Sequence, residues 1–341
     1  MNIRKPKQHS FVRALTAGVM AIAASVGIAG AANANSYTMK ISTPTINELQ
    51  HEWAQMYKEL LEKKTDNKIA VQIFPASQLG PIASVIEGVQ LGSIEATLTP
   101  YEFFAGVDRR YQTPGMPGLY STMQEAYDKL HSPKVRETLM SLGETKGLVG
   151  LSSIVYGPQI FVSKTPINTL ADFQGKKIRV LASEIEVEAV KSLGAAPVPM
   201  PLTEVSSALQ QGAIEGANNL YDVVVPQKMY TFAPNVVETD LWFTVVHATV
   251  SEAWLKQLPD DLRQAVIDTA KELEPTIFQH QLNRQQKALD AWLENGGKVT
   301  KLSEEDSRVA HQKATDATAA YLEAHPALRE TYELIGNAGT E

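Results

Sequence analysis

The chain repeatedly alternates short strand-like segments with amphipathic helical segments, and this order limits its fold more than any other feature. The strand-like segments of the N-terminal part are residues 37–42, 69–74 and 96–99, and the helical segments are residues 47–64 and 82–91. A similar alternation runs from Gly175 to Asn219. Because a helix between successive strands is a crossover connection, the pattern predicts an α/β fold with a mainly parallel sheet covered by helices.

The middle and C-terminal parts of the chain add longer segments to this plan. Residues 149–155 and 160–162 have the pattern of strands on either side of Gly157 and Pro158, and residues 236–250 contain one or two further strands. Residues 259–295 carry either two helical stretches or one very long helix. A chain of 341 residues is too long for one typical core, so two lobes are expected.

Residues 1–34 have the pattern of a secretory signal peptide. A basic start is followed by an apolar run over 14–30 and by Ala-Asn-Ala at 32–34, which predicts cleavage after Ala34. The alternative is an uncleaved membrane anchor, but the apolar run is shorter than a typical span and is interrupted by Gly18 and Gly27. We therefore expect a periplasmic location.

Charge and cysteine content restrict the classes of function. The chain has no cysteine, so disulfides, a thiol nucleophile and a cysteine-linked lipid anchor are all excluded. Removal of residues 1–34 would lower Lys and Arg from 31 to 27 against 38 Asp and Glu, which changes the formal net charge from −7 to −11. An acidic chain is a poor partner for nucleic acid or an anionic membrane surface, and any anion site in it needs a local cation.

The sequence shows no recognisable catalytic, metal or nucleotide motif. Its seven histidines do not stand at metal-ligand spacings from one another, and GxSxG, GxGxxG and GxxxxGK[ST] are absent. We expect no enzymatic activity, no metal site and no cofactor. A hydrolase with scattered catalytic residues would escape this search, so a periplasmic enzyme remains an alternative.

Arg179 is the leading candidate for a functional residue. It lies in an alternating strand-like segment in which Ile178 and Val180 point to the opposite face. An arginine beside a core is costly unless an anion meets it, and its planar fork suits a carboxylate. The anion is either a ligand carboxylate or a structural partner, for which Asp172 and Glu184 are the nearest candidates in sequence.

Several ordered motifs resemble one protein family. They are GKKIRV at 175–180, LGAAPVPMP at 193–201, EVSSALQQGAIEG at 204–216, and the longer segments 74–98 and 166–180. Together they resemble the solute receptors of tripartite ATP-independent periplasmic (TRAP) transporters, of the C4-dicarboxylate-receptor type. The resemblance runs from about Tyr37 to the C-terminal helices.

The resemblance implies two α/β lobes with a ligand cleft between them and one long helix that spans both. Residues 260–294 are the only run long enough for that helix. The implied lobes are 35–156 plus 245–285 and 157–244 plus 286–341. The implied function is to bind a small organic acid and deliver it to integral-membrane permease subunits. The alternatives are a receptor for an ABC importer and a binding protein that serves a signalling receptor.

The resemblance also implies roles for three residues. Arg179 corresponds to the arginine that clamps the ligand carboxylate, and Asn219 to an asparagine that contacts ligand, although Asn219 could simply be a turn residue. Gln159 stands where many relatives have a second arginine. A neutral amide does not balance a second carboxylate, so we expect a monocarboxylate such as a sugar acid, a hydroxy acid or an aromatic acid rather than a C4-dicarboxylate.

Five further ligand-binding candidates come from their positions beyond strand ends or at the presumed crossing between lobes. Aromatic side chains pack well on sugar faces and aromatic rings, although each could equally belong to the core. A polar residue near the start of the first helix could contact ligand or only cap the helix. These candidates are Tyr101, Tyr156, Tyr221, Trp242 and Asn47.

Overall fold

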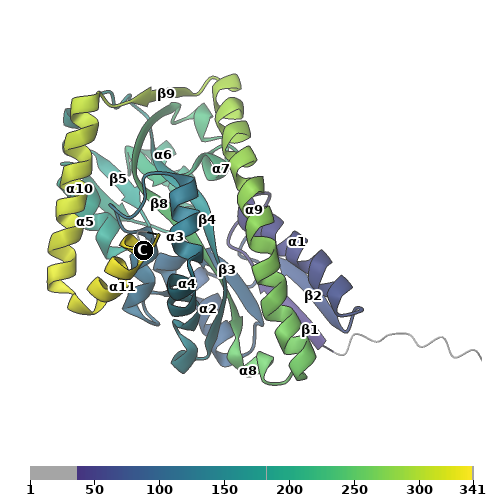
Figure 1. The fold of residues 1–341 in the computed structure, drawn as a ribbon. Helices are drawn as coiled ribbons and strands as arrows, with labels where there is room; N and C mark the ends of the chain where they lie inside the picture. The colour runs from purple at the N-terminus through teal and green to yellow at the C-terminus, as the bar shows by residue number, and fades with distance from the viewer. Residues whose placement is uncertain (1–36, 182, 340–341) are drawn as a thin grey trace, which may run out of the picture. The chain divides into compact units, whose positions relative to one another are not determined.

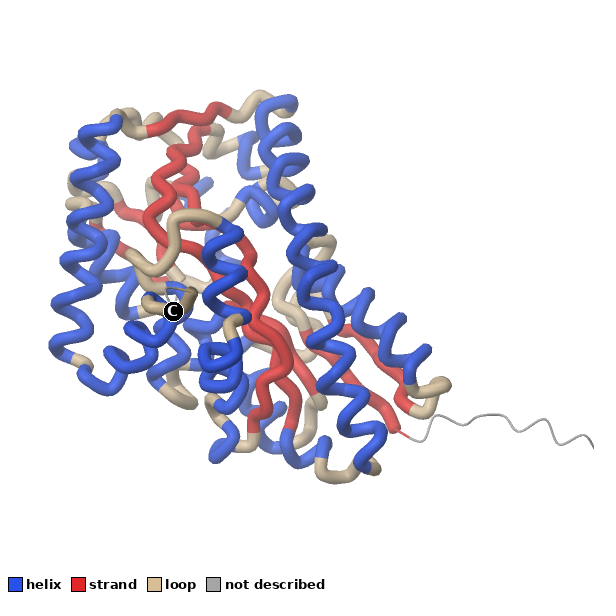
Figure 2. The backbone as a smooth tube through the Cα atoms, in the orientation of Figure 1, coloured by secondary structure: helices blue, strands red, loops and turns tan. Residues whose placement is uncertain are grey.

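The computed structural model describes residues 37–181 and 183–339. The signal peptide predicted for residues 1–34 lies outside this part of the chain. Within the described residues the strands form one nine-stranded sheet in the order β2-β1-β3-β8-β4-β7-β5-β6, with β9 paired to β8. Figure 2 shows these strands passing through the protein with helices on either side.

The N-terminal alternation forms the elements that its periodicity predicts. They are β1 (Tyr37–Ser42), α1 (Leu49–Lys64), β2 (Ile69–Phe74), α2 (Ile82–Leu91) and β3 (Ala96–Pro100). β1 pairs in parallel with both β2 and β3. The Glu48 carboxylate caps α1 by accepting from the backbone N–H groups of Gln50 and His51, so the cap is Glu48 rather than Asn47.

The second alternation forms a matching parallel set. It consists of β5 (Lys177–Val180), α5 (Glu184–Ser192), β6 (Ala196–Pro199), α6 (Leu202–Gln211) and β7 (Gly216–Asn219). β5 lies between β6 and β7 and is parallel to both. This order agrees with the alternation expected between Gly175 and Asn219, because the helices carry an apolar stripe, such as Val205 and Leu209 of α6.

A long antiparallel pair joins the two parallel sets, and this pairing was not predicted. β4 (Leu148–Ser163) and β8 (Asn235–Ser251) pair along most of their lengths, and they connect β3 on one side to β7 on the other. The expectation of two short strands on either side of Gly157 and Pro158 is wrong. These residues produce register shifts within one continuous strand, as β-bulges do, instead of ending it.

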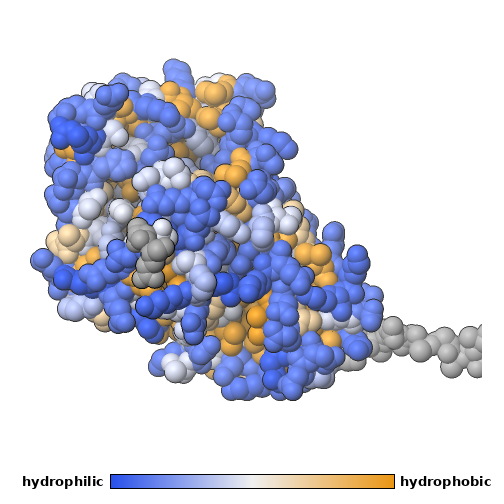
Figure 3. Space-filling model, viewed as in Figure 1, coloured by the Kyte–Doolittle hydropathy of each residue, from blue (hydrophilic) through white to orange (hydrophobic). Residues whose placement is uncertain are grey.

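The remaining helices cover the faces of the sheet. They are α3 (Met123–His131), α4 (Pro133–Ser141), α7 (Tyr221–Val224), α8 (Glu252–Leu255), α10 (Glu304–Ala324) and α11 (Pro326–Gly336), and the last strand is β9 (Lys298–Lys301). No helix among the described residues is long and apolar enough to span a bilayer. The face in Figure 3 is mostly hydrophilic, with small separate hydrophobic areas.

One helix extends from α1 of the first parallel set to α7, which follows β7 of the second set. α9 (Asp260–Glu294) is a single 35-residue helix, so the alternative of two helical stretches is excluded. It packs against α1 and β4, and further along against α7 and β9 (Figure 1). Pro275 removes one backbone donor within it, but burial of Leu273, Ile277 and Phe278 holds both sides of this point against the core.

Candidate functional site

A cavity of about 60 Å³ lies where the carboxyl ends of both parallel sets meet. Pro44 and Thr45 follow β1, Pro100 ends β3, Leu181 follows β5, and Leu220 follows β7. Open α/β sheets bind ligands beyond these strand ends. The other lining residues are Gln50, Ile82, Phe103, Tyr156, Gln159, Arg179, Leu202, Asn219, Val223 and Thr244. Arg179 is the one charged side chain among the described residues that line the cavity.

Arg179 is buried, with 3% of its surface exposed. Its Nε donates to the carbonyl of Met200 at 3.0 Å and its Nη1 to the carbonyl of Asn218 at 3.1 Å. Both acceptors are neutral backbone groups. These bonds fix the orientation of the guanidinium group without neutralising its charge.

The acidic partners considered from the sequence are occupied elsewhere. Asp172 is half-buried and accepts from the backbone of Asn168 and Thr169. Glu184 pairs with Arg109 at 2.6 Å. Arg179 takes part in none of the ion pairs found within 4.0 Å among the described residues.

Burial weakens the charged form of Arg179 but does not remove it. It lowers the pKa of Arg179 to about 10, and the negative charge of Glu186 acts in the opposite direction. The side chain therefore stays cationic at neutral pH. A buried cation without a paired carboxylate is a site that an anion would stabilise.

Asn219 lies beside this cation at the end of β7. Its Oδ1 accepts from the N–H of Leu220 at 3.0 Å, whereas its buried Nδ2 has no partner. The neighbouring Asn218 is fully buried, and neither its Oδ1 nor its Nδ2 has a partner. Asn219 thus provides a free amide donor on the lining of the cavity.

Gln159 is bound on one side only. Its Nε2 donates to Glu186 Oε1 at 2.8 Å, and Glu186 Oε2 accepts from the N–H of Leu181 at 2.9 Å. The Oε1 of Gln159 is buried and has no partner. The amide expected from the sequence to face a ligand is therefore oriented by a carboxylate in the first turn of α5.

Two buried glutamates interact behind Gln159. Burial, together with the nearby charge of Glu186, raises the pKa of Glu102 to about 8. Burial also raises the pKa of Glu186, although its hydrogen bonds from Gln159 and Leu181 and the charge of Arg179 favour its ionised form. Glu102 lies in a 3₁₀ turn (Tyr101–Phe104), and its Oε2 has no partner.

Tyr156 lines the cavity and is held by the cap of α1. Its hydroxyl donates to Glu48 Oε2, and its carbonyl accepts from Gln281 and Gln285 of α9. The ring is therefore fixed between β4, α1 and α9, and its position depends on three elements far apart in sequence.

The other sequence candidates lie outside the cavity lining. Tyr101 is fully buried, shares a hydrogen bond with Ser153 and contacts the ring of His247. Trp242 packs edge-on against Phe161 in the core. Tyr101 follows β3 and Trp242 lies within β8 as expected, but both side chains belong to the hydrophobic core.

Tyr221 and Asn47 also take other positions. Tyr221 donates to Glu238 and lines a separate depression with Leu282 and Leu289. Asn47 is exposed at a φ of 60°, and its carbonyl accepts from Arg284.

Sequence reasoning missed several residues that line the cavity. Phe103 does so because the 3₁₀ turn after β3 sends Tyr101 and Phe104 inward and leaves Phe103 on the opposite side. Gln50 and Thr244 are polar lining residues within predicted elements. No local pattern distinguishes them from ordinary helix and strand residues.

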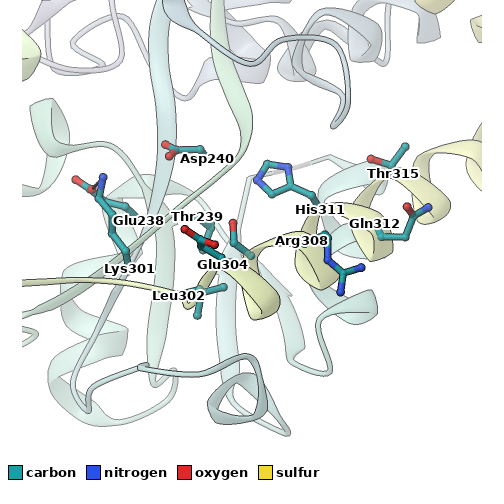
Figure 4. A pocket seen from close by; sticks show the side chains of 11 residues that line it. Glu238, Thr239, Asp240, Lys301, Leu302, Glu304, Arg308, His311, Gln312 and Thr315 are labelled. Atoms are coloured by element: carbon teal, nitrogen blue, oxygen red, sulfur yellow. Dashed lines mark ion pairs between the residues drawn. The ribbon is translucent and has the colours of Figure 1, made fainter.

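A larger surface depression has different chemistry. It measures about 590 Å³ and lies between β8, β9 and α10 (Figure 4). Its lysine and arginine are already paired, Lys301 with Glu238 at 3.2 Å and Arg308 with Glu305. The lining also includes Asp240 and Glu304, so acidic groups already offset the charges of Lys301 and Arg308.

The family of the chain follows from comparison with known proteins. The model of the bacterial extracellular solute-binding proteins, family 7, matches residues 42–324. The chain belongs to this family. Proteins of the family are periplasmic substrate-binding receptors rather than enzymes.

Curated relatives of this family 7 receptor cover different shares of it. An uncharacterised Salmonella typhimurium protein is 35% identical over 47% of this chain, and the match spans about half, 49%, of that relative. The 2,3-diketo-L-gulonate-binding periplasmic protein of Escherichia coli is 29% identical over 73% of this chain and 76% of its own length. A C4-dicarboxylate-binding periplasmic protein of Shewanella loihica is 26% identical, with coverages of 64% and 65%.

Solved structures show the same fold. A TRAP periplasmic solute-binding protein from Desulfovibrio salexigens with bound orotic acid has a TM-score of 0.83 at 25% identity, covering 89% of this chain and 98% of that one. One from Haemophilus influenzae with bound L-gulonate has a TM-score of 0.84 at 21% identity, with coverages of 89% and 99%. The family 7 receptor therefore has the two-lobed α/β fold of these proteins.

Proposed function

We propose that this protein is the extracytoplasmic receptor of a TRAP transporter, and that it binds one small organic acid through Arg179 and Asn219. The observation that carries the proposal is a buried guanidinium without a carboxylate partner, on the lining of a cavity at the strand ends. The free Nδ2 of Asn219 supplies a second donor. Together they suit one carboxylate group.

The lining favours a ligand with one dominant anionic group. Arg179 is the single cation of the described lining, and the neutral Gln159 stands where a second cation would balance a diacid. Ile82, Phe103 and Leu202 give the cavity apolar walls that suit the carbon skeleton of a monocarboxylate. Relatives described as binding orotate, L-gulonate and galacturonate support a carboxylate ligand.

A C4-dicarboxylate receptor is the second candidate. It is favoured by the relatives described as C4-dicarboxylate-binding proteins and by a structural neighbour with bound succinate. Such a ligand would place its second carboxylate near Gln159 or against apolar walls, where no cation offsets its desolvation. We therefore expect succinate to bind more weakly than a monocarboxylate.

Transport requires the receptor to change shape around its ligand. We infer lobes formed by residues 35–156 plus 245–285 and 157–244 plus 286–341, which close by hinge motion. The ligand shifts this equilibrium by its differential affinity for the closed form, which integral-membrane permease subunits then recognise.

The test compares ligand-induced stabilisation of the wild type and of Arg179→Ala. A ligand that binds only the folded state raises the melting temperature by mass action, so a panel of monocarboxylates and dicarboxylates identifies true ligands. We expect the strongest shift with a monocarboxylate and no shift with Arg179→Ala. The matched control is Arg308→Ala, in the larger depression, which should keep the wild-type response. Equal affinity of wild type and Arg179→Ala by calorimetry would contradict the proposal.

A further inference from the structure

The unpartnered oxygen of Gln159 is an unused acceptor next to the proposed carboxylate site. Gln159 and Arg179 both line the cavity, and both interact with Glu186, one by a hydrogen bond and one electrostatically. Gln159 is 2% exposed, so solvent does not satisfy its Oε1. A buried acceptor without a donor is costly, and a ligand that brings a donor would remove that cost.

Glu186 decides which end of the Gln159 amide remains free. An ionised carboxylate only accepts hydrogen bonds, so it binds the NH₂ group of the amide and leaves the oxygen on the other side. The second oxygen of Glu186 accepts from the N–H of Leu181, which holds the carboxylate in place. Glu186 is not itself among the residues lining the cavity.

Of the two neighbouring carboxyl groups, Glu186 is the one that stays ionised and Glu102 the one that stays protonated. The two buried carboxyl groups disfavour simultaneous ionisation. Glu186 has hydrogen bonds and a nearby cation that stabilise its charge, whereas Glu102 Oε2 has no partner. A proton shared by the pair therefore rests on Glu102, and Glu186 remains an acceptor.

We propose that the receptor selects hydroxy acids whose hydroxyl lies close to the carboxylate, and that Glu186 sets this selectivity by orienting Gln159. The ligand hydroxyl donates to Gln159 Oε1 while its carboxylate binds Arg179 and Asn219. An oxo group at the same position would place its oxygen against Gln159 Oε1, and two acceptors cannot form a hydrogen bond. An unsubstituted acid would leave Gln159 Oε1 unpaired. The inference rests on the proposed function and specifies its ligand.

The experiment measures dissociation constants by calorimetry for matched sets of hydroxy, oxo and unsubstituted acids. The probes are lactate, pyruvate and propionate; 2-hydroxyisocaproate, 2-oxoisocaproate and isocaproate; and mandelate, phenylglyoxylate and phenylacetate. In the set that binds most tightly, we expect the dissociation constant of the hydroxy acid to be lower than those of both analogues by about tenfold or more. Equal binding within that set, or a preference for the oxo acid, overturns the inference.

Three variants test the role of Glu186. In Glu186→Gln the new amide can accept from Leu181 and donate to Gln159 Oε1, which turns the NH₂ of Gln159 toward the ligand. We expect this variant to prefer the oxo acid. Glu102→Gln is the matched control, since it changes the neighbouring carboxyl group and should keep the hydroxy preference. Gln159→Met should bind all three acids of a set alike.

The outcomes separate this inference from the proposed function. If Glu186→Gln folds and keeps the wild-type preference, the orienting role is wrong. If Glu186→Gln does not fold, the test is whether the wild type prefers the hydroxy acid over its two analogues and whether Gln159→Met loses that preference. A third outcome is that the acids bind, that Arg179→Ala abolishes binding, and that the hydroxy acid binds no more tightly than its analogues. In that case the proposed receptor function stands and the proposed selectivity is wrong. If no acid binds, or Arg179→Ala binds as wild type, the receptor proposal itself fails.

Discussion

At the scale of single residues, the cavity is surrounded by polar groups whose bonding is incomplete. Arg179 has only neutral hydrogen-bond partners, and Gln159 and Asn219 each keep a buried polar atom without a partner. Buried polar atoms in folded proteins normally have partners. Their concentration around one cavity indicates a place where bound ligand completes the hydrogen bonding.

The buried carboxyl of Glu102 gives stability a measurable pH dependence. Its pKa in the folded protein, about 8, exceeds the usual value of 4.5, so between these values the folded state holds a proton that the unfolded state has lost. The contribution of this group to the free energy of unfolding is fully present below about pH 4.5 and is lost as the pH rises through about 8. We expect the wild-type melting temperature to fall relative to that of Glu102→Gln between pH 5 and 9. Parallel melting curves across this range would contradict the shift.

At the scale of elements, the bulge in β4 depends on one glycine. Gly157 has a φ of 144°, and a Cβ added there would lie 1.9 Å from Nε2 of Gln285, which donates to the carbonyl of Tyr156. A side chain would strain the backbone and displace the contact between β4 and α9.

Gly157→Ala should therefore lower the free energy of unfolding by about 1–3 kcal/mol in urea denaturation. Gly106→Ala is the matched control, since no atom lies within 4 Å of its added Cβ, and we expect almost no change in that variant. Similar stability of the two variants would show that the bulge tolerates a side chain.

At the scale of the whole described chain, α9 connects α1 of the first parallel set to α7, which follows the second set, through polar contacts. Arg284 of α9 pairs with Glu52 of α1 and with Asp222 of α7. Asp222 also accepts from Gln281 at 2.8 Å, and only 1% of its side chain is exposed. Arg284 is the cation that offsets this buried carboxylate.

Arg284→Met should destabilise the protein by about 3 kcal/mol, because Asp222 would remain buried without its cation. Lys64→Met removes an exposed pair with Glu272 and serves as the control, for which at most about 1 kcal/mol is expected. Chemical denaturation of both variants measures the difference. Equal effects would mean that the Arg284 contacts act as ordinary surface pairs.

The sequence by itself indicated the type and order of most elements, left open whether residues 259–295 form one helix or two, and selected Arg179, Asn219 and Gln159 as candidate ligand residues. Those features depend on periodicity and on motifs only a few residues long, which are local properties. Only the tertiary structure decided that β4 runs continuously through Pro158 and pairs with β8, because strand pairing joins residues far apart in the chain. It also decided which faces are packed, so that Tyr101 and Trp242 lie in the core while Phe103 lines the cavity. The partner of Gln159 came from α5 for the same reason: a hydrogen bond depends on distance in space, and sequence separation does not specify it.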